Sequence, residues 1–66
     1  MNIKINNEPA IVAEGIKLAS IAMMLQLPDK GVAVAVNNAM VPRAEWAART
    51  VQEGDDIVIL KAFCGG

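Results

Sequence analysis

Residues 32–38 read Val-Ala-Val-Ala-Val-Asn-Asn, and this stretch indicates the fold class more clearly than any other in the chain. Valine alternates with alanine, which is the period-two pattern of a β-strand that has its larger side chains on one face. The pair Asn37-Asn38 is typical of a tight hairpin turn, because asparagine tolerates the positive φ angles that such a turn needs. We therefore predict a strand over 32–36 that turns and returns through residues 40–41.

The segment before this strand has the spacing of an amphipathic helix. Leu18, Ile21, Ala22 and Leu25 fall at positions i, i+3, i+4 and i+7, so they share one face. The alanine, methionine and leucine content of the segment also favours a helix. We expect Pro28 to end it.

The N-terminal residues predict a hairpin. Ile3 and Ile5 alternate with polar residues, which indicates a half-buried first strand. Residues 6–9, Asn-Asn-Glu-Pro, form a turn cluster. Residues 10–13 are then expected to return as an edge strand, with Pro9 at its start, where proline is tolerated.

After the predicted 32–41 hairpin, the chain is expected to hold one helical turn within residues 43–49, around Trp46, which we interpret as a core side chain. Residues 54–56, Gly-Asp-Asp, are predicted to form a turn whose acidic side chains are solvated. Residues 57–61 are rich in β-branched residues and predict the last strand.

This order of elements predicts an α+β domain in which one helix packs across one face of a mixed sheet. If the first and last strands are neighbours they run parallel, which is the β-grasp (ubiquitin-like) arrangement. We assign residues 1–62 to a single domain and residues 63–66 to a flexible tail.

Alternation in the last strand also predicts an apolar outer sheet face. If Ile57 and Ile59 point towards the helix, Val58 and Leu60 point to the opposite face, together with the alanines of the 32–36 strand. Two interpretations stay open: ordinary apolar surface, or a docking surface for a partner.

Composition argues against several classes of function. The net charge is −1, there are two aromatic residues, and no basic patch or stacking platform indicates nucleic-acid binding. The chain has no histidine and one cysteine, so neither a self-contained active site nor a metal site is expected. No apolar stretch is long enough to span a membrane. We expect a cytoplasmic protein that binds no cofactor stably.

The C-terminal tail, Cys64-Gly65-Gly66, carries the candidate chemistry. Glycines lack Cβ atoms, so Gly65 and Gly66 can thread a narrow channel in an extended form. Attack of the Gly66 carboxylate on the α-phosphate of ATP would give an acyl-adenylate, which a sulfur or nitrogen nucleophile can open. The tail is then a group to be activated by another protein; the alternative is a merely flexible end.

These features together resemble the thiamin-biosynthesis sulfur carrier family (ThiS-type) of the ubiquitin-like β-grasp superfamily. The resemblance spans nearly the whole chain. It is carried by Ala-Val-Asn-Asn at 35–38, Val-Pro-Arg at 41–43 with Trp46, Val-Gln-Glu-Gly-Asp at 51–55 with Ile57, and the terminal Gly-Gly.

The resemblance implies a set of partners. An E1-like adenylating enzyme (ThiF-type) would activate Gly66 with ATP and magnesium. A cysteine desulfurase route would then convert it to a thiocarboxylate, and thiazole synthase (ThiG-type) would accept the sulfur. We expect these partners to dock on Val58, Leu60 and Phe63.

Cys64 departs from the small or aliphatic residue usual beside the diglycine. It either enters the partner's channel as a small side chain or forms a transient disulfide. Two other functions also remain open: the small subunit of molybdopterin synthase, and a ubiquitin-like modifier or adaptor.

Overall fold

The central hairpin forms as the valine–alanine alternation predicts. The structure, a computed structural model, describes residues 1–28 and 31–61. Strand β3 (Val32–Val36) pairs antiparallel with β4 (Ala39–Val41). Asn37 and Asn38 form the turn between them with φ angles of 52° and 70°. Positive φ at both positions is the requirement of a two-residue turn that matches strand twist, which confirms the predicted turn.

The N-terminal hairpin is tighter than predicted. Strands β1 (Asn2–Ile5) and β2 (Glu8–Ile11) pair antiparallel, with Ile5 opposite Glu8. Asn6 and Asn7 alone make the turn, with φ angles of 52° and 71°. The predicted return strand therefore forms at the edge of the sheet, but it spans residues 8–11 and not 10–13, and the turn does not extend to Pro9. Two left-handed asparagines already reverse the chain, so pairing resumes at Glu8.

Helix α1 (Leu18–Met24) ends before the predicted stop at Pro28. Gln26 adopts a left-handed conformation with a φ angle of 55°. The N–H of Leu27 donates a 3.1 Å hydrogen bond to the carbonyl oxygen of Ala22. This bond and the left-handed residue form a Schellman motif, which closes the helix without proline.

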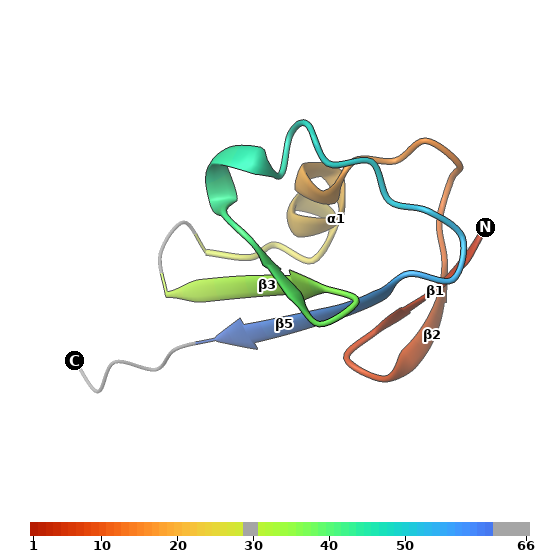
Figure 1. Cartoon of the computed structure of the whole chain (residues 1–66), viewed down its shortest axis with the longest axis horizontal. Coiled ribbons are helices and arrows are strands. Elements are labelled where there is room, and N and C mark those ends of the chain that lie inside the picture. The colour runs from red at the N-terminus through yellow and green to blue at the C-terminus, as the bar shows by residue number, and fades with distance from the viewer. Residues whose placement is uncertain (29–30, 62–66) are drawn as a thin grey trace.

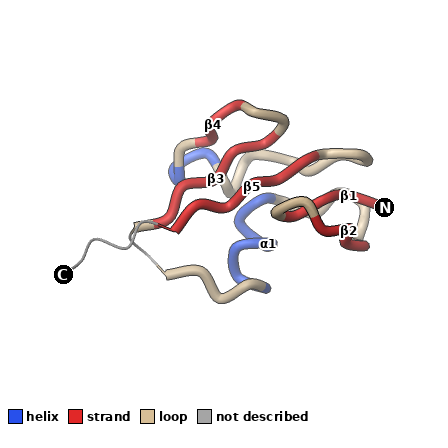
Figure 2. The backbone as a smooth tube through the Cα atoms, turned by 90° about the horizontal axis from the view of Figure 1, so that it is seen from below, coloured by secondary structure: helices blue, strands red, loops and turns tan. Residues whose placement is uncertain are grey.

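The strands form one mixed sheet in the order β2-β1-β5-β3-β4. The last strand, β5 (Asp56–Lys61), starts one residue before the prediction; it runs parallel to β1 and antiparallel to β3. Figure 1 shows α1 and the connection that leads into β5 on the same side of the sheet, and Figure 2 shows β5 between β3 and β1. This topology confirms the predicted α+β class and the β-grasp arrangement.

The core lies between the sheet and α1. Trp46 is buried there, and its Nε1–H donates a 2.9 Å hydrogen bond to the carbonyl oxygen of Val41. It follows a single 3-10 turn, η1 (Arg43–Glu45), where the sequence predicted one helical turn. The other buried core residues are Ile3, Val12, Leu18, Ile21, Val34, Val36, Val41, Val51 and Ile57.

The acidic turn before β5 is not a solvated loop throughout. Asp55 is 7% exposed. Its carboxylate accepts hydrogen bonds from Asn37 Nδ2 at 3.0 Å and from the N–H of Gln52 at 2.8 Å. The prediction that the acidic side chains here are solvated is thus wrong for Asp55, which joins this turn to the β3–β4 turn.

Candidate functional site

The outer face of the sheet carries the apolar side chains that alternation predicts. Leu60 lies opposite Ala33, and Val58 lies opposite Ala35, in the β3–β5 register. Leu60 is 55% exposed, whereas Ile57, whose side chain points to the other face of β5, is fully buried. Residues that face each other across a ladder share a side of the sheet. These four side chains therefore form one surface away from α1.

Met40 extends this surface and was missed in the sequence. It lies opposite Ala35 in the β3–β4 register and is 62% exposed. The signal was present, because a two-residue turn at Asn37-Asn38 fixes the pairing of Met40 with Ala35. We call the surface formed by Ala33, Ala35, Met40, Val58 and Leu60 the outer apolar patch.

Charged residues bound the outer apolar patch on the β1 side. Lys4 is paired in register with Asp56, at the start of β5. Asp56 precedes Val58 by two residues and shares its side of the strand. The patch therefore covers the half of the face built by β5, β3 and β4, and it reaches Leu60, close to the end of β5.

Two asparagines from the hairpin turns hold β5 from either side. Asn37 Oδ1 accepts a 3.0 Å hydrogen bond from the N–H of Asp56, and its own N–H donates to the Asp56 carbonyl at 2.8 Å. On the other side, Asn6 Oδ1 accepts a 2.8 Å hydrogen bond from the N–H of Ile59. Sequence reasoning identified both asparagines as turn residues only. Together they fix the strand that leads to the C-terminus.

The remaining predicted site residues follow the last described strand. Phe63, Cys64, Gly65 and Gly66 lie outside the described residues. Lys61, paired in register with Val32, is the point from which they continue. Of the predicted site residues, the structure therefore places only Val58 and Leu60, both in β5 ahead of Lys61.

Other candidate chemistry is limited in the part of the chain that the structure describes. No group of three or more His, Cys, Asp or Glu side chains is arranged there to hold a metal ion. No helix in the described ranges has both the length and the hydropathy of a membrane span. Arg43 stacks 4.4 Å from the Trp46 ring centroid and donates a 2.7 Å hydrogen bond to the Pro28 carbonyl.

Known proteins of the same size and fold match this chain. The family model described as "ThiS family" matches residues 3–66. The sulfur carrier protein ThiS of Escherichia coli (strain K12) is 33% identical over 66 residues, which is the full length of both chains.

Two solved structures support the same assignment. The crystal structure of a thiamine biosynthesis protein (ThiS) from Geobacter metallireducens is 29% identical, covers all of both chains and has a TM-score of 0.85. The NMR solution structure of a thiamine biosynthesis protein from the same organism has 29% identity, covers all of this chain and 88% of the other, and has a TM-score of 0.81. With the family model reaching from residue 3 to Gly66, this chain belongs to the ThiS family.

Proposed function

We propose that this chain is a sulfur carrier, not an enzyme, and that the Gly66 carboxylate is its working group. The observation that carries the proposal is the ThiS family match, which runs through Gly65 to Gly66. The relatives named above are a sulfur carrier and thiamine biosynthesis proteins. We assign this chain the same role: it donates sulfur for the thiazole ring of thiamin.

The chemistry has two steps, and both take place at the Gly66 carboxyl group. A Gly66 carboxylate oxygen attacks the α-phosphate of ATP, so that pyrophosphate leaves and an acyl-adenylate forms. A sulfur nucleophile at the oxidation level of sulfide then adds to the acyl carbon and releases AMP, which leaves a thiocarboxylate. An E1-like adenylating enzyme of the ThiF type supplies the ATP and magnesium site.

The sulfur comes from cysteine as the persulfide of a cysteine desulfurase, a thiol reductant takes it to the sulfide level, and it leaves to a thiazole synthase of the ThiG type. The carrier contributes recognition and an extended end: Gly65 and Cys64 pass into the partner's channel, where small side chains fit. The outer apolar patch, with Phe63 leading from it to the tail, is the surface on which both partners dock. Its support is the exposed Leu60 and Met40, which present apolar area on the outer face of the sheet; Leu60 directly precedes Lys61, from which the tail continues.

The test is the intact mass of the chain after incubation with the adenylating enzyme, ATP, magnesium, a cysteine desulfurase, cysteine and a thiol reductant. We expect a gain equal to the replacement of one oxygen atom by sulfur. A variant without Gly66 should gain nothing and keep the thermal stability of the wild type, because a chain end outside the core contributes little to folding.

Two results would contradict the proposal. The first is an unchanged mass in the presence of an adenylating enzyme that is active on another carrier, which would favour an adaptor. The second is an isopeptide-linked product in place of the thiocarboxylate, which would identify a modifier.

A further inference from the structure

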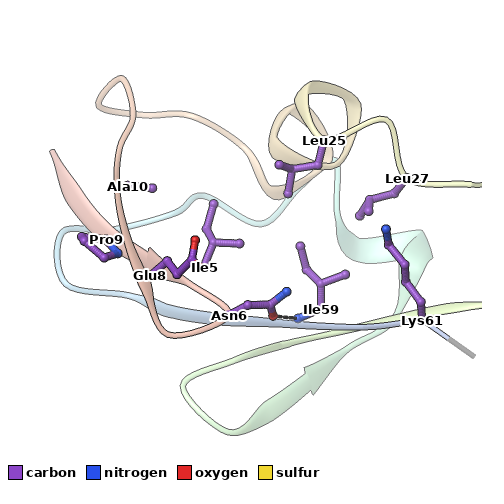
Figure 3. A pocket seen from close by; sticks show the side chains of 9 residues that line it. All are labelled: Ile5, Asn6, Glu8, Pro9, Ala10, Leu25, Leu27, Ile59 and Lys61. Carbon is purple, nitrogen blue, oxygen red and sulfur yellow. Dashed lines mark hydrogen bonds between the residues drawn. The ribbon is translucent and has the colours of Figure 1, made fainter.

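A groove lies on the side of the sheet that faces α1, beside the end of β5. It has a volume of about 380 Å³. Figure 3 shows the β1–β2 hairpin at one end, the chain that follows α1 above, and β5 below. The residues that line it are Ile5, Asn6, Glu8, Pro9, Ala10, Leu25, Leu27, Ile59 and Lys61.

Strand β1 leaves β5 at the floor of this groove. Their parallel register ends with Ile5 opposite Ile57. The N–H of Asn6 still donates to the carbonyl oxygen of Ile57 at 2.8 Å. Its side-chain Oδ1, not its backbone carbonyl, accepts the N–H of Ile59 at 2.8 Å (Figure 3). The Asn6 side chain thus accepts the last hydrogen bond of the parallel ladder, while the Asn6 backbone turns away from β5.

Beyond this step the edge of β5 is open. In a strand, backbone groups of alternate residues point to the same side. The backbone groups of Ile57 and Ile59 point towards β1. The Ile59 carbonyl and the Lys61 N–H therefore also point to the β1 side of β5. Neither group has a backbone hydrogen-bond partner on that side among residues 1–28 and 31–61. An unpaired strand edge of this kind is a template for pairing with another chain.

The walls of the groove suit the side chains of an added strand. Leu25 is 42% exposed, and Figure 3 shows it and Leu27 directed into the groove above Ile59. Lys61 stands at the tail end and Glu8 at the hairpin end, and neither has an ion-pair or side-chain hydrogen-bond partner among the described residues. The groove is therefore lined mostly by apolar side chains, with Asn6 among them, and carries opposite charges at its two ends.

We propose that this groove accepts an extended segment of the adenylating enzyme, which adds to β5 as a parallel strand. One residue of that segment donates its N–H to the Ile59 carbonyl and accepts the Lys61 N–H at its own carbonyl. Its two neighbours point into the groove, where apolar side chains contact Leu25 and Leu27. A basic residue lies at the Glu8 end of the segment, and an acidic residue lies at the Lys61 end.

The inference rests on the proposed carrier function, since it assigns the segment to the enzyme that acts on the tail. The position of the groove supports that assignment. The five residues that follow Lys61 span at most about 17 Å when extended. A strand paired at Lys61 therefore lies within that distance of the Gly66 carboxylate. If the enzyme also docks on the outer apolar patch, it would contact the end of β5 from both faces of the sheet.

The first test is amide hydrogen exchange of the full chain, free and saturated with the purified adenylating enzyme. We expect the exchange of the Lys61 N–H to slow at least tenfold in the complex. The N–H of Leu60 is the internal control, because it already faces β3 in the ladder and its exchange should slow much less. An unchanged Lys61 rate in a saturated complex would overturn the inference.

The second test compares Lys61→Pro with Lys61→Ala. Both remove the charge, but only proline removes the N–H, and that N–H does not take part in the β3 ladder. We expect Lys61→Pro to bind the enzyme about tenfold more weakly than Lys61→Ala, the scale of one backbone hydrogen bond. Thermal unfolding of both variants checks that each is folded.

The outcomes separate the two proposals. Equal affinities for the two variants, with a normal mass gain in the wild type, overturn the added strand and leave the carrier function intact. If the wild type neither binds the enzyme nor gains mass, the carrier function fails and the added strand fails with it.

Discussion

Asn6 Oδ1 accepts the N–H of Ile59 at 2.8 Å, across 53 residues of sequence. The acceptor sits in the first turn of the chain and the donor in its last strand. The side chain continues the β1–β5 ladder after the backbone of β1 has turned away. It therefore determines both where the parallel pairing stops and where the open edge of β5 begins.

Asn6→Gly should destabilise the domain by about 1 kcal/mol, the net value of one hydrogen bond. Glycine keeps the positive φ of 52° but leaves the Ile59 N–H without its acceptor. Urea unfolding gives the free-energy change, and the Ile59 amide should exchange faster. Asn7→Gly is the matched control, since its φ of 71° also suits glycine. Equal effects of the two changes would show that the turn, not the bond, matters.

Leu60→Asp and Val58→Asp should each lower the rate of Gly66 adenylation at least tenfold, because a carboxylate would be desolvated within an apolar contact. Pyrophosphate release measures this rate. Ile11→Asp is the control, as Ile11 is 82% exposed at the opposite edge of the sheet. If all three variants kept the wild-type rate, the outer apolar patch would not be the docking surface.

Asp55→Ala should reduce stability by about 1–3 kcal/mol, because Asn37 Nδ2 and the Gln52 N–H both lose their acceptor. This is a large share of the total, since a core of this size supplies only about 3–5 kcal/mol. Thermal unfolding measures the loss. Glu53→Ala is the comparison: its carboxylate accepts one exposed bond, from the Asn2 N–H, and removing it should cost less. The reverse order would contradict the structural role of Asp55.

Trp46→Phe should destabilise the domain by about 1–2 kcal/mol, because the buried Val41 carbonyl loses the indole donor. Arg43→Ala removes an exposed guanidinium above the same ring and should cost about 0.5–1 kcal/mol. Denaturant unfolding of both variants measures the two effects. A larger loss for Arg43→Ala would mean that the stacking on Trp46 and the hydrogen bond to the Pro28 carbonyl together contribute more than the buried bond.

Local patterns predicted those parts of the fold that depend on neighbouring residues. The 32–36 alternation gave the bounds of β3 and the orientation of Val58 and Leu60 followed from period two. The end of α1 was not predicted, because glutamine is an uncommon residue for the left-handed position that Gln26 occupies. The start of β2 was missed because residues 6–9 were all assigned to the turn, whereas Asn6 and Asn7 alone reverse the chain and pairing resumes at Glu8.

Contacts between distant segments were beyond sequence reasoning. Neither the Asn6–Ile59 bond nor the burial of Asp55 has a signal in nearby residues, since each depends on how the hairpins meet β5. The groove needs Leu25 and Leu27 to be carried over β5 by the early end of α1. The features of the ThiS family, with the terminal Gly65-Gly66, could in contrast be recognised in the sequence without any structure.

The central position of β5 also has a mechanical consequence. A pull on the chain beyond Lys61 acts along the strand axis, and the ladder bonds to β3 lie across that axis. Such a load is shared among these bonds in shear, whereas a pull at a sheet edge would open them one at a time. The strand thus anchors the chain at Lys61 against a pull along the strand axis.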